Sequence, residues 1–295
     1  MYPMFRCLAH AVLLFISIPV LGQQNMVLWE TLAPEETTRS TGETLPFLPN
    51  ENPHVTRVVK IRAPSLDIYL PTAKPTGTGV LIIPGGGFGK VVVDKEGSEA
   101  ATWLNSLGIA AFVLRHRTNE ENTPDEPVWR RPLQDAQRAI RLIRQHSNQW
   151  QLNPDRIGVL GFSAGGQVAA ILLTAPEPDP DAAGSGNGPE RTLPDFALLI
   201  YPWRTLKPDG RDLIDPIRIT PKTAPAFLVH THDDGSSSVG SALIYIALKQ
   251  NNVSAELHIY QNGGHGYGMR KTPGSDTDTW PNRATDWLRR RGLGR

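Results

Sequence analysis

Residues 157–167 read IGVLGFSAGGQ. The first four are apolar enough for a buried strand, and the helix-compatible run AGGQVAAILLT follows a tight glycine turn. A strand, a sharp turn and a helix together lift a serine hydroxyl clear of the backbone at a helix N-terminus. Gly161 and Gly165 suit such a turn, because a side chain at either position would crowd it. The bare G-x-S-x-G pattern is weak by itself, so Ser163 is either a nucleophile or a small residue in an ordinary glycine-rich turn.

The rest of the chain repeats this alternation of strands and helices. Such alternation implies a mostly parallel sheet with helices on both faces, which is an α/β fold. The stretch between Pro202 and Ala224 is too short for a large cap domain. The expected strands are 80–83, 109–114, 157–160, 196–201, 226–229 and 255–260, and the expected helices are 95–107, 131–150, 164–174, 238–250 and 279–290.

Upstream of this region the pattern is less regular. Residues 55–71 contain two strand-like runs broken at Ala63-Pro64, which predicts a β-hairpin. Residues 23–53 are polar and contain prolines, so we expect a loosely packed N-terminal arm there.

The composition is that of a globular protein. The chain has 295 residues, of which 39% are hydrophobic, and this is enough for one sizeable core. Its formal net charge is only +1, with acidic and basic residues intermixed. The basic cluster RRRGLGR at the C-terminus fits cations at the end of a helix. We therefore expect no nucleic-acid partner.

The N-terminal segment has the features of a secretory signal peptide over residues 1–22. Arg6 precedes an apolar stretch that runs from about residue 8 to residue 21, and cleavage is expected after Gly22. Cys7, the only cysteine, would be lost with the signal. Export without disulfides indicates a periplasmic or secreted protein. The alternative is an uncleaved membrane anchor.

A nucleophilic serine needs a base and an acid that orients the base, and parallel α/β sheets offer them in the order serine, acid, histidine. Residues 224–237 read APAFLVHTHDDGSS and place Asp233 and Asp234 just beyond a buried strand. Asp234 is our candidate acid, with Asp233 as the alternative. His265 lies in the glycine-rich stretch NGGHGYG after the last strand. The alternatives are a metal cluster at HTHDD and a solvated loop histidine at 265.

Backbone N–H donors are also needed where negative charge develops in acyl transfer. Residues 82–89 read IIPGGGFG, and three glycines after a strand allow the backbone to approach a substrate closely. The N–H groups of Gly86 and Gly87 can then join that of Ala164, which follows the candidate nucleophile. A phosphate-binding loop is the alternative, although neither G-x-G-x-x-G nor G-K-[ST] is present.

These motifs resemble those of bacterial α/β-hydrolase esterases of the carbohydrate acetyl esterase type (acetylxylan-esterase-like), which have feruloyl-esterase-like relatives. The resemblance runs from about Val80 to Tyr267. The matching segments are PGGGFG, DKEGSEAATWLNSLGIAAFVLRHR, PLQDAQRAIRLIR, NPDRIGVLGFSAGG, LVHTHDD and ELHIYQNGGHGYG. After Asp234 the family commonly continues with a valine-proline segment, whereas GSSSVG stands here, so Asp233 stays an alternative.

The resemblance implies an α/β-hydrolase domain over residues 54–295, without a large cap. It implies a catalytic set of Ser163 as nucleophile, His265 as base and Asp234 as orienting acid. Gly86, Gly87 and Ala164 would supply the oxyanion hole.

The implied reaction is hydrolysis of acetyl esters on carbohydrate, with no cofactor or metal and no membrane partner once the signal is cleaved. Phe88, Trp203 and Tyr267 either contact the sugar or pack in the core. Alternatives are another α/β-hydrolase activity (feruloyl esterase or peptidase) and a secreted carbohydrate-binding protein without catalysis.

Overall fold

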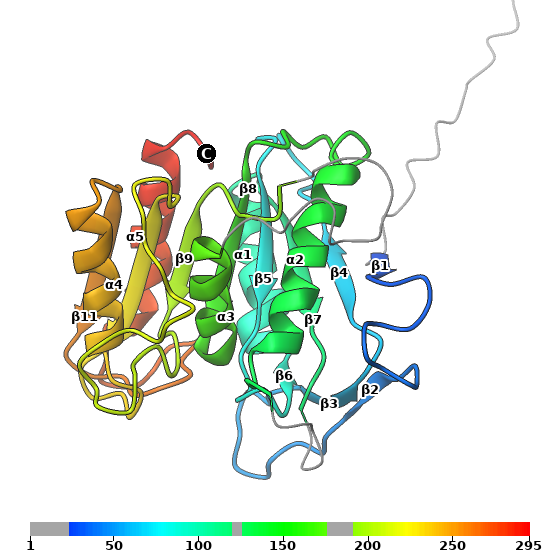
Figure 1. Ribbon diagram of the computed structural model, residues 1–295, viewed down its shortest axis with the longest axis horizontal. Coiled ribbons are helices and arrows are strands. Elements are labelled where there is room, and N and C mark those ends of the chain that lie inside the picture. The colour runs from blue at the N-terminus through cyan, green and yellow to red at the C-terminus, as the bar shows by residue number, and fades with distance from the viewer. Residues whose placement is uncertain (1–23, 120–125, 176–190) are drawn as a thin grey trace, which may run out of the picture.

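A computed structural model describes residues 24–119, 126–175 and 191–295 of the chain (Figure 1). The expected signal peptide and Cys7 lie outside the described residues. Among the described helices, none is long and apolar enough to cross a lipid bilayer.

An eight-stranded sheet forms the centre of the molecule, as the alternating pattern predicts. β4 runs antiparallel to its neighbours β1 and β7, and the other neighbouring pairs are parallel. In spatial order the strands are β1 (Gln24–Val27), β4 (Ser65–Tyr69), β7 (Ala110–Arg115), β5 (Gly79–Ile83), β8 (Ile157–Phe162), β9 (Ala197–Ile200), β10 (Ala226–Thr231) and β11 (Ala255–Tyr260).

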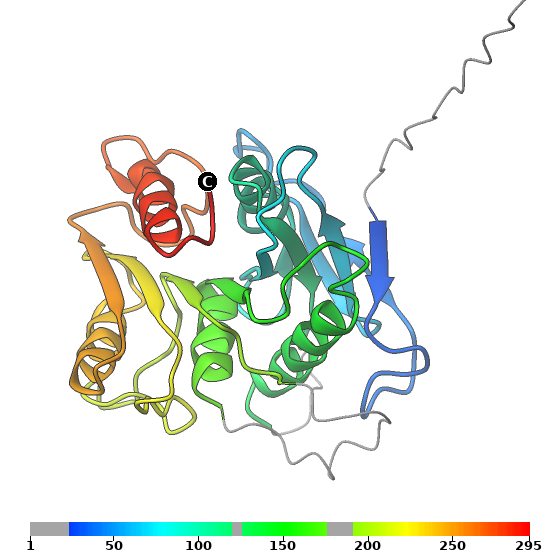
Figure 2. The same ribbon diagram turned by 90° about the horizontal axis from the view of Figure 1, so that it is seen from above.

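Helices cover both faces of this sheet (Figures 1 and 2). One face carries α2, α3 and α4, and the other carries α1 and α5, with a π-helical turn, η1, leading into α1. Their bounds are η1 (Asp94–Ser98), α1 (Glu99–Ser106), α2 (Arg130–Gln145), α3 (Ser163–Thr174), α4 (Val239–Gln250) and α5 (Trp280–Arg290), and a short 3₁₀ turn, η3 (Thr277–Thr279), precedes α5.

Two apolar cores result, one on each face of the sheet. Successive side chains of a strand point to opposite faces, so the fully buried run of β5 supplies both cores. Leu81 and Ile83 pack with α2 and α3, whereas Val80 and Ile82 pack with α1. Burial on both sides explains why the parallel strands read as continuous apolar runs rather than as alternating ones.

The prediction of a β-hairpin at Ala63-Pro64 is wrong. β3 (Arg57–Ile61) belongs to a second, three-stranded antiparallel sheet with β2 (Thr41–Thr44) and β6 (Val91–Val92). β4 instead joins the central sheet. The backbone N–H groups of Arg62 and Ala63 donate to the Ser40 carbonyl at 2.8 and 2.7 Å, and Pro64 has no N–H to donate. The segment between β3 and β4 therefore forms no hairpin turn, and the chain passes there from the smaller sheet to the central one.

Part of the N-terminal arm is also built into the fold, contrary to the expectation of loose packing. β1 is the edge strand of the central sheet, and Leu28 beyond it is 1% exposed. Glu35 pairs with Arg130 at 2.6 Å and Glu36 with Arg131 at 3.1 Å. The arm is held because its acidic residues meet arginines that lie almost a hundred positions away in the sequence.

Close approach of α3 to the carboxyl end of β5 fixes the turn around Ser163. A Cβ on Gly165 would overlap the carbonyl oxygen of Ile83, and a Cβ on Gly161 would overlap the carbonyl oxygen of Gly165. The two glycines predicted to be needed in the turn therefore stand where backbone meets backbone.

We expect Gly165→Ala to lower the free energy of unfolding by about 3 kcal/mol, because the added methyl group displaces the backbone of β5. Gly235→Ala is the matched control, since a Cβ there meets no atom within 4 Å. Urea denaturation of both variants measures the difference. Equal stability of the two would contradict the tight approach of α3 to β5.

Candidate active site

Ser163 is the first residue of α3 and follows β8 directly. Its φ of 52° lies in the left-handed region, which few residues other than glycine adopt. Such a conformation is held only where the surroundings enforce it, and here Gly161 and Gly165 leave the space for it. The residue is largely buried, with 8% of its surface exposed.

His265 lies in the loop after β11 and faces Ser163. Its Nε2 is 2.7 Å from the Oγ of Ser163. Its side chain is 32% exposed, so solvent and a ligand can reach the imidazole. Gly263, Gly264 and Gly266 have positive φ values, which let the loop fold back towards the end of β8.

Asp234, rather than Asp233, is the carboxylate that meets His265. Its Oδ2 is 2.6 Å from the Nδ1 of the imidazole, and its side chain is fully buried. Asp233 instead accepts hydrogen bonds from the backbone N–H groups of Gly263 and Gly264, at 3.1 and 2.9 Å. The two adjacent acids therefore have different roles, one on the ring and one on the loop that carries the ring.

The environment of Asp234 favours its ionised form. Burial by itself raises the pKa of the carboxyl group, but hydrogen bonds from His230, His265 and the backbone N–H of Ser236 outweigh it and lower the pKa to about 2. At neutral pH a carboxylate therefore faces the Nδ1–H of His265 and leaves Nε2 free to accept the hydroxyl proton of Ser163.

His230 supports Asp234 from the buried side and has no free nitrogen. Its Nε2 lies 2.7 Å from the Ser236 carbonyl and 3.1 Å from Asp234, and its Nδ1 lies 2.9 Å from the hydroxyl of Ser241. Within residues 24–119, 126–175 and 191–295, no three histidine, cysteine or acidic side chains gather as metal ligands would.

The glycine loop after β5 lies against Ser163, because β5 and β8 are neighbours in the sheet. A Cβ on Gly85 would lie 2.7 Å from the Cβ of Ser163. Gly86 and Gly87 follow with φ values of 135° and 65°. Gly87 has no atom within 4 Å of a built Cβ, so the space beside it is open to a ligand.

Ala164 lies at the N-terminal end of α3, where backbone N–H groups have no carbonyl partner within the helix. The structure therefore brings the three expected oxyanion donors, Gly86, Gly87 and Ala164, to the same end of the sheet as Ser163.

The three aromatic residues expected near a ligand differ in exposure. Phe88 and Tyr267 are 2% and 5% exposed and pack in the two cores. Phe88 has a φ of 67°, and its carbonyl accepts from Asn119, so the chain turns back there and the ring is directed inward. Trp203 stays partly exposed, and the guanidinium of Arg204 covers one face of its ring at 4.1 Å.

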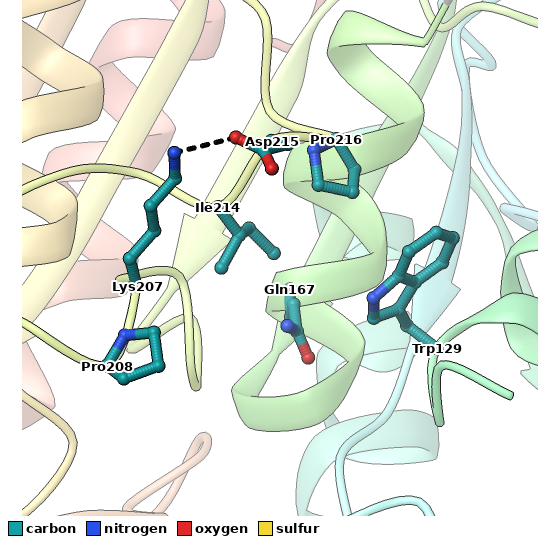
Figure 3. A pocket seen from close by; sticks show the side chains of 7 residues that line it. All are labelled: Trp129, Gln167, Lys207, Pro208, Ile214, Asp215 and Pro216. Atoms are coloured by element: carbon teal, nitrogen blue, oxygen red, sulfur yellow. Dashed lines mark ion pairs between the residues drawn. The ribbon is translucent and has the colours of Figure 1, made fainter. Parts of the chain in front are cut away.

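A pocket of about 390 Å³ opens beside α3 (Figure 3). Gln167 lines it, one helical turn after Ser163, and Trp129 lies across from it. Lys207 and Asp215 also line it and form an ion pair of 2.7 Å. This pocket has no signal in the sequence, because its walls come from α3, the start of α2 and a loop that carries no recognisable motif.

Sequence reasoning also missed Glu96 and Tyr201, which are buried beneath the site and hydrogen-bonded to each other at 2.9 Å. Glu96 lies inside the segment DKEGSEAATW, where it resembles any polar residue of an amphipathic helix. In the sequence, Tyr201 is indistinguishable from the last residue of the apolar strand FALLIY. Neither has a local signal of its role.

A serine on a strand–helix turn, with a histidine and a buried aspartate on later loops at the carboxyl edge of a parallel sheet, defines an α/β hydrolase. Comparisons with known proteins agree with this class. The BD-FAE family model matches residues 66–179.

Among solved structures, an acetyl ester-xyloside bifunctional hydrolase from Caldicellulosiruptor lactoaceticus is 30% identical, with a TM-score of 0.67 over 88% of this chain and 100% of that one. A thermophilic esterase from Thermogutta terrifontis has the same fold at 19% identity, with a TM-score of 0.67 over 86% of this chain and 95% of that one.

An acetylxylan esterase from Xylanibacter ruminicola is 28% identical over 225 residues, which are 68% of this chain and 43% of that protein. The chain thus spans less than half the length of this curated relative. It belongs to the bacterial α/β-hydrolase esterases, the family that its motifs resemble, and the expected fold is confirmed.

Proposed function

We propose that the protein is a serine carboxylic-ester hydrolase that removes acetyl groups from carbohydrate esters through an acyl-enzyme intermediate. The observation that carries this proposal is the unbroken line of hydrogen bonds from the hydroxyl of Ser163 through His265 to Asp234, with distances of 2.7 and 2.6 Å. A hydroxyl is a weak nucleophile unless a positioned base removes its proton, and this arrangement supplies that base.

Acylation begins when Ser163 attacks the carbonyl carbon of the ester. His265 takes the hydroxyl proton on Nε2, and the carboxylate of Asp234 stabilises the imidazolium that forms. The backbone N–H groups of Gly86, Gly87 and Ala164 stabilise the negative oxygen of the tetrahedral intermediate. The C–O bond to the sugar then breaks, and His265 returns the proton to the departing alcohol.

Deacylation repeats these steps with water as the nucleophile. His265 takes a proton from the water as it attacks the acyl-enzyme, and Ser163 leaves with that proton when the acid is released. The partly exposed imidazole gives the water direct access. Side chains and backbone of this chain suffice for each step, so the proposal includes no cofactor.

The carbohydrate part of the proposal rests on the relatives and on the surface beside the site. Relatives named as an acetylxylan esterase and an acetyl ester-xyloside hydrolase suggest sugar acetates as substrates. The pocket beside α3 combines an indole ring, Trp129, with polar groups, among them Gln167 of the helix that begins at Ser163. Sugar rings pack on aromatic faces and hydrogen-bond at their edges, so this pocket suits a saccharide that carries the ester.

The decisive measurement is acetate release from acetylated xylan and acetylated monosaccharides. We expect release by the wild-type protein and none above background by Ser163→Ala, because the variant has no nucleophile. Cleavage of 4-nitrophenyl acetate without release from any sugar would retain the mechanism and reject the carbohydrate substrate. Full activity of the variant would reject Ser163 as the nucleophile.

Substitution of the two adjacent acids separates their roles. We expect Asp234→Asn to lower kcat for 4-nitrophenyl acetate by about 10³- to 10⁴-fold, because an amide that faces Nδ1 favours the wrong tautomer of His265. Asp233→Asn keeps one acceptor for the loop glycines and is the matched control, with a loss of less than about tenfold. A larger loss in the Asp233 variant would reverse the assignment.

We further propose that the protein acts outside the cytoplasm, in the periplasm or the medium, after removal of residues 1–22. The apolar segment between Arg6 and Gly22 supports this proposal. N-terminal sequencing of protein from those fractions is expected to begin at Gln23. A chain that keeps Met1 and stays with the membrane would favour an uncleaved anchor.

A further inference from the structure

Glu96 is a buried carboxyl group that the proposed reaction does not use. It lies in η1 and is 3% exposed. Its Oε2 accepts a hydrogen bond of 2.8 Å from the backbone N–H of Gly85, and its Oε1 accepts one of 2.9 Å from the hydroxyl of Tyr201. A carboxyl group is costly to bury, and hydrogen bonds at both oxygens reduce that cost.

Tyr201 extends this contact to the loop that carries His265. Its hydroxyl, which donates to Glu96, also accepts the backbone N–H of Gly268 at 2.8 Å. Its ring meets the imidazole of His265 edge to face, with centroids 5.0 Å apart. The residue is fully buried just beyond β9. Tyr201 thus touches both the ring of His265 and the C-terminal end of its loop.

Gly85 extends the contact in the other direction. It begins the glycine loop, it lies against Ser163, and Gly86 and Gly87 come next. The carbonyl of Gly85 also accepts the N–H of Val92 at 3.0 Å, so hydrogen bonds hold both peptide planes that flank Gly85, and the second of these planes carries the N–H of Gly86. One carboxyl group therefore bridges the oxyanion loop and the histidine loop across the site.

We propose that Glu96 is a positioning residue, which acts through Gly85 and Tyr201 to hold the oxyanion donors and His265 in place relative to Ser163. The inference rests on the proposed ester hydrolysis and adds a second carboxyl group to it. Asp234 orients the imidazole at Nδ1, whereas Glu96 acts on the loops around it.

The electrostatics agree with this geometry. Burial raises the pKa of Glu96, while the hydrogen bonds from Tyr201 and Gly85 and the charges of Lys95 and His265 act in the opposite direction. Replacement by glutamine turns one acceptor oxygen into an NH₂ donor. One orientation of that amide places its NH₂ group against the N–H of Gly85, and the other faces it to the Tyr201 hydroxyl, which must then change from donor to acceptor.

The test compares Glu96→Gln, Tyr201→Phe and the double variant on 4-nitrophenyl acetate. A serine-reactive phosphonate counts the competent active sites, so that kcat refers to folded protein only. We expect each single variant to lower kcat by about 10- to 100-fold, less than the loss of an oxyanion donor, with KM within about twofold of wild type. The double variant is expected to lose less than the product of the two single losses, because both substitutions break the hydrogen bond between Glu96 and Tyr201.

Matched controls carry the same chemical changes on the surface. Glu43→Gln removes a carboxylate that pairs with Lys60 in solvent, and Tyr260→Phe removes a hydroxyl that contacts Thr279. Both controls are expected to keep wild-type kcat. Wild-type kcat in Glu96→Gln, or losses that add in the double variant, would overturn the positioning role.

A readout without turnover separates this inference from the proposed function. Proton NMR of the wild-type protein is expected to show a downfield signal from the Nδ1–H of His265 held by Asp234, absent in His265→Gln. The signal shifts or broadens in Glu96→Gln if Glu96 positions the ring. An unchanged signal overturns the inference, whereas a wild-type protein that shows the signal but cleaves no ester overturns only the proposed function.

Discussion

The contact between the first turn of α3 and the carboxyl ends of β5 and β8 sets the geometry of the site. At this point backbone packs on backbone, and the absence of a side chain at Gly161 and Gly165 is what makes the approach possible. Ser163 takes up a left-handed conformation as a result, and the glycine loop that leaves β5 comes to lie beside it. The strand order then brings the loops of Asp234 and His265 to the same edge of the sheet. β9, β10 and β11 follow on the other side of β8, and Asp234 and His265 come after β10 and β11.

Around this contact three acidic residues lie in three different environments and make different hydrogen bonds. Asp233 is exposed and caps the glycine turn that brings His265 round. Asp234 is buried but surrounded by donors, so it keeps its charge and faces the imidazole. Glu96 is buried with two donors, and burial raises its pKa. Adjacent positions in the sequence do not predict similar roles, because hydrogen-bond partners and solvent access decide how each carboxyl group behaves.

The sequence predicted the central strands and helices and the glycine turn well, since their signals are local. An apolar run of strand length, as at 157–160, can be recognised without knowledge of its neighbours. The sequence did not show that β3 and β4 belong to different sheets, because strand pairing depends on partners such as β6 and β7 that lie far along the chain. The ion pairs of Glu35 and Glu36 were missed for the same reason.

Within the site, Ser163, Asp234 and His265 could be proposed from the sequence because each has a motif around it. The choice between Asp233 and Asp234 was open at the level of sequence, and only the direction of the two side chains distinguishes them. Phe88 and Tyr267 are buried, whereas Trp203 is partly exposed. No pattern in the sequence distinguishes a buried aromatic ring from an exposed one at these positions. Tyr201 and Glu96 meet only after 105 residues of chain have folded.

The burial of α3 has a consequence for how such a protein can diversify. Every residue of the helix except Thr174 is buried, so most substitutions there disturb the core and the surroundings of Ser163 together. The loop on the other side of the pocket is closed on itself, with a bridge between Leu206 and Leu213 and a backbone bond of 2.8 Å from Lys207 to Asp212, and its tip faces solvent. Residues of this loop can change at little cost in stability. Substitutions can therefore accumulate in this loop and reshape that wall of the pocket while the packing of α3 on the sheet stays unchanged.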